Sequence, residues 1–503
     1  MKQPNILMIC SDQHAARVTG AYGNRIVATP NLDKLAAEGC RFDSFYCNDP
    51  ICVPSRMSLM TGRFPFRCEV TGNQSVLDSR FPTLAHIAVR GGWHAVLSGK
   101  MHFNGSDQRH GFLERLVGEP STNALYGGAN RGHEGPPFCH LGNCSRPDPL
   151  FHVGAGVNPF VAYDGAVTEA TVRWLRQYAT GAGTRTVPPF FLMVGFLLPH
   201  CPYIAPKELY EKYRAQVKAP RLTCAELDAL HLHHRAYRKF IRLDDVPPEN
   251  FDKAAAAYYG LVDQLDRNVG AVLDALQELG LLENTIVMYF SDHGEMLGRH
   301  GRWHKDCFHE EAARVPMFVR HSSQRLVSSV SEHCSLVDLM PTLCEWAGVK
   351  PPPGMDGVSL VPLLKGTPTA TGRTVKAETY AYWDRGDWTE TSNRMVRRGP
   401  WKLCYYGDYE TGELFNLADD PGETRNLAEW PEYGSVLREL TPLLFEDGWS
   451  ANVHCEIEAQ LQAIGHTENI REYADMLRRD PLPIDAPDYW KDGAALRTRL
   501  EPE

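Results

Sequence analysis

Residues 51–63 read ICVPSRMSLMTGR and place a cysteine among small, kinked and cationic residues. A cysteine that only packs is more usual in an apolar helix or strand. If a helix starts at Pro54, a residue type favoured at the first helical position, Cys52 lies near the positive end of that helix and Arg56 lies one turn beyond. Such a helix end suits an anion. We therefore expect Cys52 and Arg56 to face an anionic ligand.

Two pairs of candidate metal ligands follow apolar runs of strand length. A carboxylate at a strand tip is often a helix cap, but two such pairs together favour a metal site. Oxygen-dominated sites suit Ca²⁺, Mg²⁺ or Mn²⁺. The pairs are Asp12 and Gln13, after residues 5–10, and Asp292 and His293, after residues 285–290.

Lysine and histidine occur close together in two further segments. Lys100 and His102 lie in GKMH, and Lys305 ends WHK. His200 follows another apolar run and is flanked by prolines. Taken alone, each lysine segment has a second interpretation as a solvated loop. The second interpretation of His200 is a structural histidine. The place of His200 after a strand makes it a candidate for the same pocket as the acidic pairs.

A sheet of buried strands would bring these residues together. Continuous apolar runs at 5–10, 190–196 and 285–290 are typical of strands buried on both faces. Helical patterns cover 31–38 and roughly 254–279, and a glycine follows each. The alternation predicts an α/β fold with a large, mostly parallel sheet between helices. Ligand sites of such sheets lie at the carboxyl ends of the strands, so the polar segments can converge there.

A smaller C-terminal part is predicted beyond a segment rich in proline, glycine and threonine, residues 350–372. Short strand patterns follow at 394–397, 401–406 and 413–416. We expect a catalytic domain over residues 1–365. Residues 366–503 are expected to form a subdomain with a small antiparallel sheet and a helical tail.

Composition excludes several classes of protein. The 503 residues include 52 basic and 62 acidic ones, and the formal net charge of -10 argues against binding nucleic acid or an anionic membrane. No run approaches the roughly 20 apolar residues of a membrane helix. The N-terminus lacks a secretory pattern, so we expect a cytoplasmic protein with its 14 cysteines reduced. The segment CHLGNC, residues 139–144, raises a zinc site as an alternative, although no second cysteine pair follows at zinc-ribbon spacing.

Residues 52–63, CVPSRMSLMTGR, match the pattern C-x-P-S-R-x-x-L-x-T-G-R, and the chain resembles type I sulfatases of the alkaline phosphatase superfamily. The resemblance implies an alkaline phosphatase-like fold and a sulfuric ester hydrolase. It also implies that Cys52 is oxidised after translation to formylglycine, an aldehyde. Further family motifs occur in the family's order at residues 5–12, 29–33, 99–102, 199–200, 291–294, 303–305 and 357–364.

The resemblance implies a nucleophile and a metal. Hydrated formylglycine at position 52 attacks sulfur, and Arg56 steadies the hydrate. Many members carry Asp-Asp and Asp-Asn as metal ligands, whereas the pairs of this chain look like those of choline sulfatases and phosphonate monoester hydrolases. Ca²⁺ is the expected cation, with Mn²⁺ and Mg²⁺ as alternatives because imidazole suits softer ions. The implied ligands are Asp12, Gln13, position 52, Asp292 and His293.

The remaining matched residues have implied roles in charge and proton transfer. Lys100 and Lys305 neutralise the sulfuryl oxygens. His200 protonates the leaving alkoxide, with Lys305 as an alternative contributor. His102 accepts a proton from the second hydroxyl of the hydrate, and sulfate is then expelled.

The alcohol portion of the substrate stays open between choline sulfate and a sugar or aryl sulfate. Aromatic residues beside acids at 383–388 and 489–492 are candidates for binding a quaternary ammonium group. The resemblance also implies a formylglycine-generating maturation enzyme as a partner and allows a homo-oligomer. Two alternatives remain: hydrolysis of a phosphonate monoester or phosphate diester at the same site, and a non-catalytic relative that binds anions.

Overall fold

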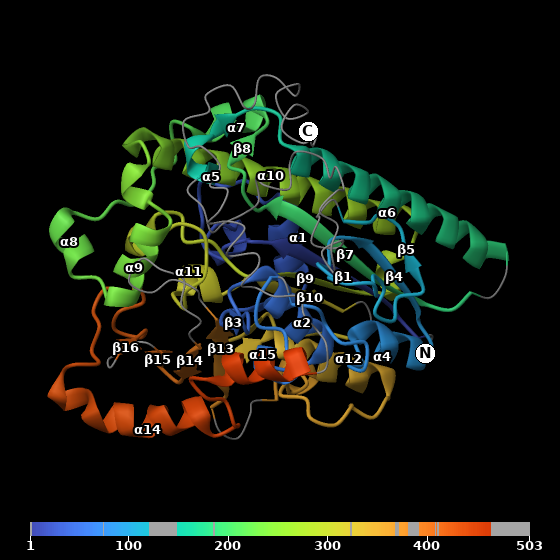
Figure 1. Ribbon diagram of the computed structural model, residues 1–503. Coiled ribbons are helices and arrows are strands. Elements are labelled where there is room, and N and C mark those ends of the chain that lie inside the picture. Colours follow the sequence, from blue (N-terminus) through green and yellow to red (C-terminus); the bar gives the residue numbers. More distant parts are fainter. Residues whose placement is uncertain are drawn as a thin grey trace, which may run out of the picture.

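Figure 1 shows the computed structural model of the chain, in which helices cover both faces of a large sheet. The structure describes residues 3–73, 75–119, 148–184, 187–321, 324–367, 372–380, 392–407, 409 and 412–463. Within them the large sheet has eight strands in the order β11-β2-β10-β9-β1-β7-β4-β5. The predicted α/β fold with a large, mostly parallel sheet is confirmed.

The three predicted apolar runs form the middle of this sheet. Strand β1 (Asn5–Asp12) pairs in parallel with β7 (Phe190–Pro199) on one side and with β9 (Thr285–Ser291) on the other. Every residue of the three strands is buried, as continuous apolar runs require. The other strands are β4 (His94–Gly99), β5 (Glu114–Arg115), β2 (Cys40–Phe42), β10 (Met317–Arg320) and β11 (Ser329–Val330).

Two helical layers complete the large domain (Figure 1). Alternate residues of β1 enter two different cores: Leu7 packs with one layer and Met8 with the other. The helix predicted over 254–279 begins earlier, at a proline, and ends one residue sooner. One layer contains α1 (Pro30–Glu38), α6 (Pro159–Thr184) and α10 (Pro248–Glu278), and the other contains α2 (Cys52–Thr61), α4 (Leu84–Arg90) and α12 (Leu339–Ala347).

Short elements connect these layers. The strands among them are β3 (Phe45–Tyr46), β6 (Gly154–Ala155), β8 (Ile204–Ala205) and β12 (Cys334–Ser335). The helices are α3 (Pro65–Cys68), α5 (Asp148–Phe151), α7 (Lys207–Tyr213), α8 (Cys224–Asp228), α9 (Leu232–Phe240), α11 (Glu310–Ala313) and α13 (Val361–Leu364).

A separate antiparallel sheet follows in the C-terminal part, in the order β13-β14-β15-β16. Its last three strands confirm the predicted strand patterns, and Leu403 and Leu414 pack against Leu440 of helix α14. The domain boundary between residues 365 and 366 stays a prediction. The elements are β13 (Thr374–Thr379), β14 (Asn393–Arg398), β15 (Trp401–Tyr406), β16 (Glu413–Asn416), α14 (Gly434–Phe445) and α15 (Val453–Ala463).

Helix length and apolar character also bear on membranes. In the described part of the chain, no helix combines the length and the hydropathy that crossing a bilayer requires.

Candidate active site

The polar segments predicted to converge do so at one edge of the large sheet. Asp12 is the last residue of β1, and Asp292 directly follows β9. His200 directly follows β7, and Lys100 directly follows β4. Because these strands are parallel neighbours, their carboxyl ends meet at the same edge.

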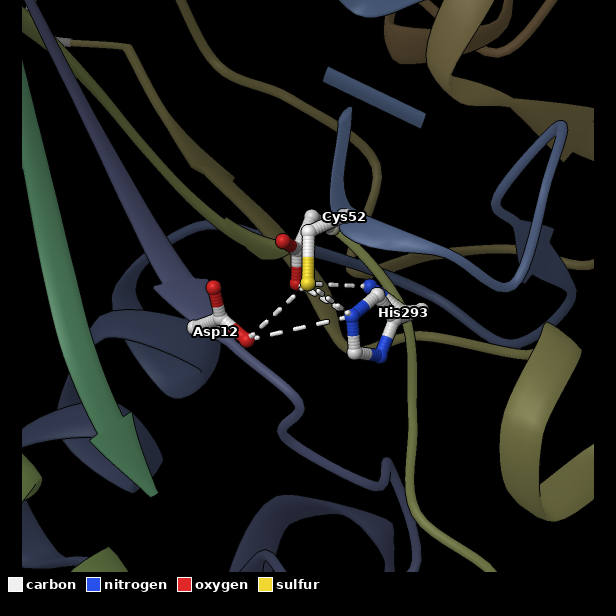
Figure 2. Close-up of side chains that lie close together, drawn as sticks. Asp12, Cys52 and His293 are labelled. Carbon is white, nitrogen blue, oxygen red and sulfur yellow. Dashed lines mark hydrogen bonds and ion pairs between the residues drawn. The ribbon is translucent and has the colours of Figure 1, made fainter. Parts of the chain in front are cut away.

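Helix α2 brings the cysteine to this edge. It begins at Cys52, two residues earlier than predicted, with Ile51 in extended backbone as its cap. The side chain of Cys52 points toward Asp12 and His293 (Figure 2). Its Sγ lies 3.2 Å from Nε2 of His293 and 3.8 Å from Oδ1 of Asp12. Cys52 is buried, with 2% of its surface exposed.

These side chains fit a divalent cation. One ligand atom from each of Asp12, Cys52, Asp292 and His293 lies within 4.8 Å of the others, and all four residues are buried. Nε2 of His293 is 3.8 Å from Oδ1 of Asp12 and 3.7 Å from Oδ1 of Asp292. Donor atoms about 3–4 Å apart surround a point about 2.0–2.6 Å from each, the range of Mn²⁺, Mg²⁺ and Ca²⁺ distances to oxygen.

The histidine of the cluster is oriented for binding. Nδ1 of His293 lies 3.1 Å from the carbonyl oxygen of Gly294, and donation there leaves the Nε2 lone pair facing Asp12 and Cys52. Burial lowers the pKa of His293, which favours the neutral ring that a metal needs.

Arg56 binds one oxygen of each of the two carboxylates. Its Nη2 donates to Oδ2 of Asp12 at 3.0 Å, and its Nε donates to Oδ2 of Asp292 at 2.8 Å. Nη1 donates to the carbonyl oxygen of Lys100 at 3.0 Å. The Oδ1 atom of each carboxylate therefore stays directed at His293, on the side where a cation would lie.

Gln13 joins the cluster through Lys305. Its Oε1 accepts a hydrogen bond of 2.7 Å from Nζ of Lys305, which lies 3.3 Å from Sγ of Cys52. Its Nε2 donates to Glu295, which also accepts from the hydroxyl of Tyr203 at 2.8 Å. The carboxylate of Glu295 thus fixes which end of the amide is oxygen. Glu295 and Tyr203 were not among the predicted site residues.

The other predicted cations lie around the same carboxylates. Nζ of Lys100 donates to Oδ2 of Asp12 at 2.6 Å, and Nε2 of His200 is 3.9 Å from Oδ1 of Asp12. Burial alone would raise the pKa of Asp12, but Lys100, His200 and Arg56 hold it well below its usual range. Burial and the positive charges of Lys100 and Arg56 lower the pKa of His102, which follows Lys100 by two residues.

The structure therefore gathers all the predicted residues into one buried cluster. Arg56, Lys100 and Lys305 face the carboxylates of Asp12, Asp292 and Glu295, so three positive charges meet three negative ones. A bound divalent cation would give the cluster the net positive charge that holding an anionic ester needs. The alternative zinc segment at 139–144 and the aromatic segments at 383–388 and 489–492 lie outside the described residues.

Comparisons with known proteins agree with this geometry. The sulfatase family model matches residues 4–349, and a model described as N-sulphoglucosamine sulphohydrolase, C-terminal, matches residues 298–447. A choline-sulfatase of Rhizobium meliloti (strain 1021) is 32% identical over 475 residues, which cover 91% of this chain and 88% of the relative. Arylsulfatase K of Bos taurus is 27% identical over 528 residues, covering 97% of this chain and 92% of that protein.

A solved structure shares the fold. The crystal structure of the phosphonate monoester hydrolase of Agrobacterium radiobacter has a TM-score of 0.73 and 24% identity to this chain, and covers 88% of this chain and 95% of that one. A family match that extends from residue 4 to residue 349 of the 503 carries the assignment: the chain belongs to the sulfatase family, the sulfuric ester hydrolases that its motifs predict.

Proposed function

We propose that the chain hydrolyses an organic sulfate monoester to an alcohol and inorganic sulfate, with formylglycine made from Cys52 and a divalent cation. The observation that carries the proposal is the position of Cys52 Sγ, 3.3 Å from Nζ of Lys305 and 3.2 Å from Nε2 of His293. A nucleophile at this point lies between a cationic side chain and the candidate metal ligands.

The side chains that would hold the cation are Asp12, Gln13, Asp292 and His293, with position 52 as a further ligand. The donor set of oxygens and one imidazole suits Ca²⁺, our first choice, and also Mn²⁺ or Mg²⁺. A cation bound there polarises the sulfate oxygens and lowers the pKa of a coordinated hydroxyl. Oxidised to formylglycine, position 52 supplies two hydroxyls as its hydrate, one to attack sulfur and one to permit the release of sulfate.

The lysines would meet the charge that develops on the sulfuryl oxygens. Lys100 and Lys305 are buried and directed at Asp12 and Cys52, so their ammonium groups flank the reacting position. In a buried site such fixed charges stabilise an anionic transition state more strongly than in water.

Two histidines would move protons. Nδ1 of His200 lies 2.7 Å from the carbonyl oxygen of Cys201, and donation there turns Nε2 toward the site, where it lies 3.9 Å from Oδ1 of Asp12. His200 then donates from Nε2 to the leaving alkoxide. Burial and the cations near His102 lower its pKa and keep its ring neutral, as a proton acceptor requires.

The first experiment is mass spectrometry of the tryptic peptide from Phe42 to Arg56. Protein made together with a formylglycine-generating enzyme is expected to carry an aldehyde at Cys52 and to hydrolyse an aryl sulfate. A Cys52→Ala variant should fold and lack turnover. A peptide that keeps its thiol in protein with no turnover would favour the non-catalytic anion-binding alternative.

A second measurement tests the substrate class. We expect an aryl sulfate to be hydrolysed faster than the matched aryl phosphonate monoester, and much faster phosphonate turnover would overturn the proposal. Choline sulfate is the first natural substrate to test, because the choline-sulfatase of Rhizobium meliloti is 32% identical to this chain. Aryl and saccharide sulfates complete the screen. The cytoplasmic location and a homo-oligomeric state stay predictions, for fractionation and light scattering to test.

A further inference from the structure

A second buried polar cluster lies between helix α9, the loop that carries Lys305 and the C-terminal sheet. We call it the Arg302 cluster. Each member is buried and polar, and none has a role in the proposed reaction. The members are His234 and Tyr237 of α9, Arg302 of the loop, Tyr406 of β15 and Glu413 of β16.

Arg302 holds the backbone around Lys305. Its Nη2 donates to the carbonyl oxygens of Lys305 at 3.2 Å and Asp306 at 3.0 Å. Its guanidinium carbon lies 3.6 Å from the centre of the Tyr237 ring. Nη1 donates to Nδ1 of His234 at 3.0 Å. A planar, always charged fork can make these contacts together, which a lysine ammonium cannot.

The loop needs such support because its backbone is strained. His304 and Asp306, on either side of Lys305, have φ of 65° and 63°, in the left-handed region that disfavours residues with a Cβ. The hydroxyl of Tyr237 fixes the loop further by donating to the carbonyl oxygen of Trp303 at 2.7 Å. Strained backbone persists where its surroundings over-determine it, so the position of Lys305 depends on these contacts.

The cluster extends into the C-terminal sheet. Nε2 of His234 lies 2.9 Å from Oε2 of Glu413, and the hydroxyl of Tyr406 donates to the same oxygen at 2.6 Å. Since Arg302 donates to Nδ1 of His234, a neutral ring carries its proton on Nε2 and donates it to Glu413. Burial lowers the pKa of His234 to about 4, in keeping with a neutral ring.

A metal ion is a weaker explanation of these histidines. Ligand atoms of His234, His309 and Glu413 lie within 4.8 Å of one another, as do those of His300, His309 and Glu423. The rings of His300 and His309 are parallel and 3.8 Å apart, whereas two imidazoles on one Zn²⁺ have converging lone pairs and centres about 5 Å apart. In the other group the Nε2 of His234 is occupied by its proton.

We propose that Arg302 is a positioning residue for Lys305, and that Glu413 of the C-terminal sheet holds Arg302 in place through His234. The inference rests on the proposed catalytic role of Lys305. It gives the C-terminal sheet a part in the reaction although Glu413 does not touch the reacting position.

A double-mutant cycle tests the inference in the matured, metal-loaded enzyme. With an aryl sulfate, Arg302→Met should lower kcat about a hundredfold, since a shift of about 1 Å in a catalytic group has that effect, and change KM much less. In a Lys305→Ala background the same substitution should change kcat no further than about twofold, because both act on one group. Arg302→Lys should restore part of kcat.

Two matched variants of His234 test the inference if Arg302→Met does not fold. Glutamine can accept from Arg302 and donate to Glu413, so His234→Gln should keep most of kcat. His234→Leu can do neither. Its kcat should fall about tenfold or more, because Arg302 and Glu413 each lose a hydrogen bond. Thermal unfolding of each variant shows that the comparison is between folded proteins.

Three results would overturn the inference. If the fold losses of kcat from Arg302→Met and Lys305→Ala multiply in the double variant, Arg302 does not act through the lysine. Stoichiometric zinc that His234→Leu removes would assign the cluster to a metal. Full kcat in Lys305→Ala would remove the catalytic role on which the inference rests, and would count against the proposed function itself.

Discussion

Replacing Arg56 by methionine should leave the carboxylates of Asp12 and Asp292 buried without their shared cation. Arg56 is fully buried and donates charge-assisted hydrogen bonds to both, and a third bond to a backbone carbonyl. Removing one partner of such a buried pair costs about 3–5 kcal/mol. With an unfolding entropy of about 2.1 cal/mol/K per residue, a chain of this size that unfolds cooperatively should lose about 3–5 °C of Tm.

The loss should depend on the metal. In protein stripped with a chelator, the two carboxylates of the variant repel each other across the space that the guanidinium filled, although Lys100 still pairs with Asp12. A bound Ca²⁺ supplies the missing positive charge, so the loss of Tm should be smaller with Ca²⁺ than with chelator. By linkage, Arg56→Met should gain more Tm from Ca²⁺ than the unaltered protein does. Thermal unfolding of both proteins, each with Ca²⁺ and with chelator, measures the four values.

Arg394 offers a matched control. It is also fully buried and pairs with Glu378 at 3.1 Å and Asp447 at 2.6 Å, in the C-terminal part. Arg394→Met should lose a similar number of degrees, equally with Ca²⁺ and with chelator. If Arg56→Met also loses the same amount in both conditions, Asp12 and Asp292 do not share a cation site, and the reasoning fails.

Three further predictions concern the metal, the proton donor and the buried charges. Chelation should stop sulfate ester hydrolysis, and Ca²⁺ or Mn²⁺ should restore it; activity that survives exhaustive chelation would count against the metal. His200→Ala should slow alkyl sulfates, which have poor leaving groups, far more than activated aryl sulfates, and equal losses would refute its role as proton donor. Lys402 is buried between Glu310 at 2.6 Å and Glu423 at 2.7 Å. Lys402→Met should therefore lower Tm by several degrees while the folded protein keeps its kcat. Thermal unfolding and initial rates measure the two quantities.

Local patterns predicted most of the fold elements. The apolar runs that became β1, β7 and β9 are buried along their whole length, so their composition reports burial directly. The order of the strands was not predictable, because β7 lies beside β1 although almost two hundred residues separate them. The start of α2 was misjudged because a proline fits anywhere in the first turn, where its missing N–H needs no partner.

The site followed from motifs, but its supporting residues did not. Except for Lys305, which lies in a loop, the predicted residues follow strand ends or lie in the first turns of a helix, and such positions are visible in sequence. Glu295, Tyr203 and Arg302 act by orienting Gln13 or Lys305, and this depends on contacts between distant segments. Glu295 follows His293 by two residues, so its closeness to a motif was the one available signal. Arg302 offered a similar signal, because it directly precedes the motif at 303–305, but its partner His234 lies 68 residues away and could not be inferred.

Two arginines thus support the site from different sides, and their effects should separate. Arg56 contacts the carboxylates that would hold the cation, so its loss should appear as a change in how strongly Ca²⁺ stabilises the protein. Arg302 contacts the backbone of Lys305, whose ammonium group faces Gln13 and Cys52, so its loss should appear in kcat. If Arg302→Met altered the Ca²⁺ dependence of Tm as strongly as Arg56→Met, the lysine loop would be part of the metal site rather than a separate source of charge for the transition state. The route for such an effect would be Gln13, which accepts from Lys305 and is itself a proposed ligand.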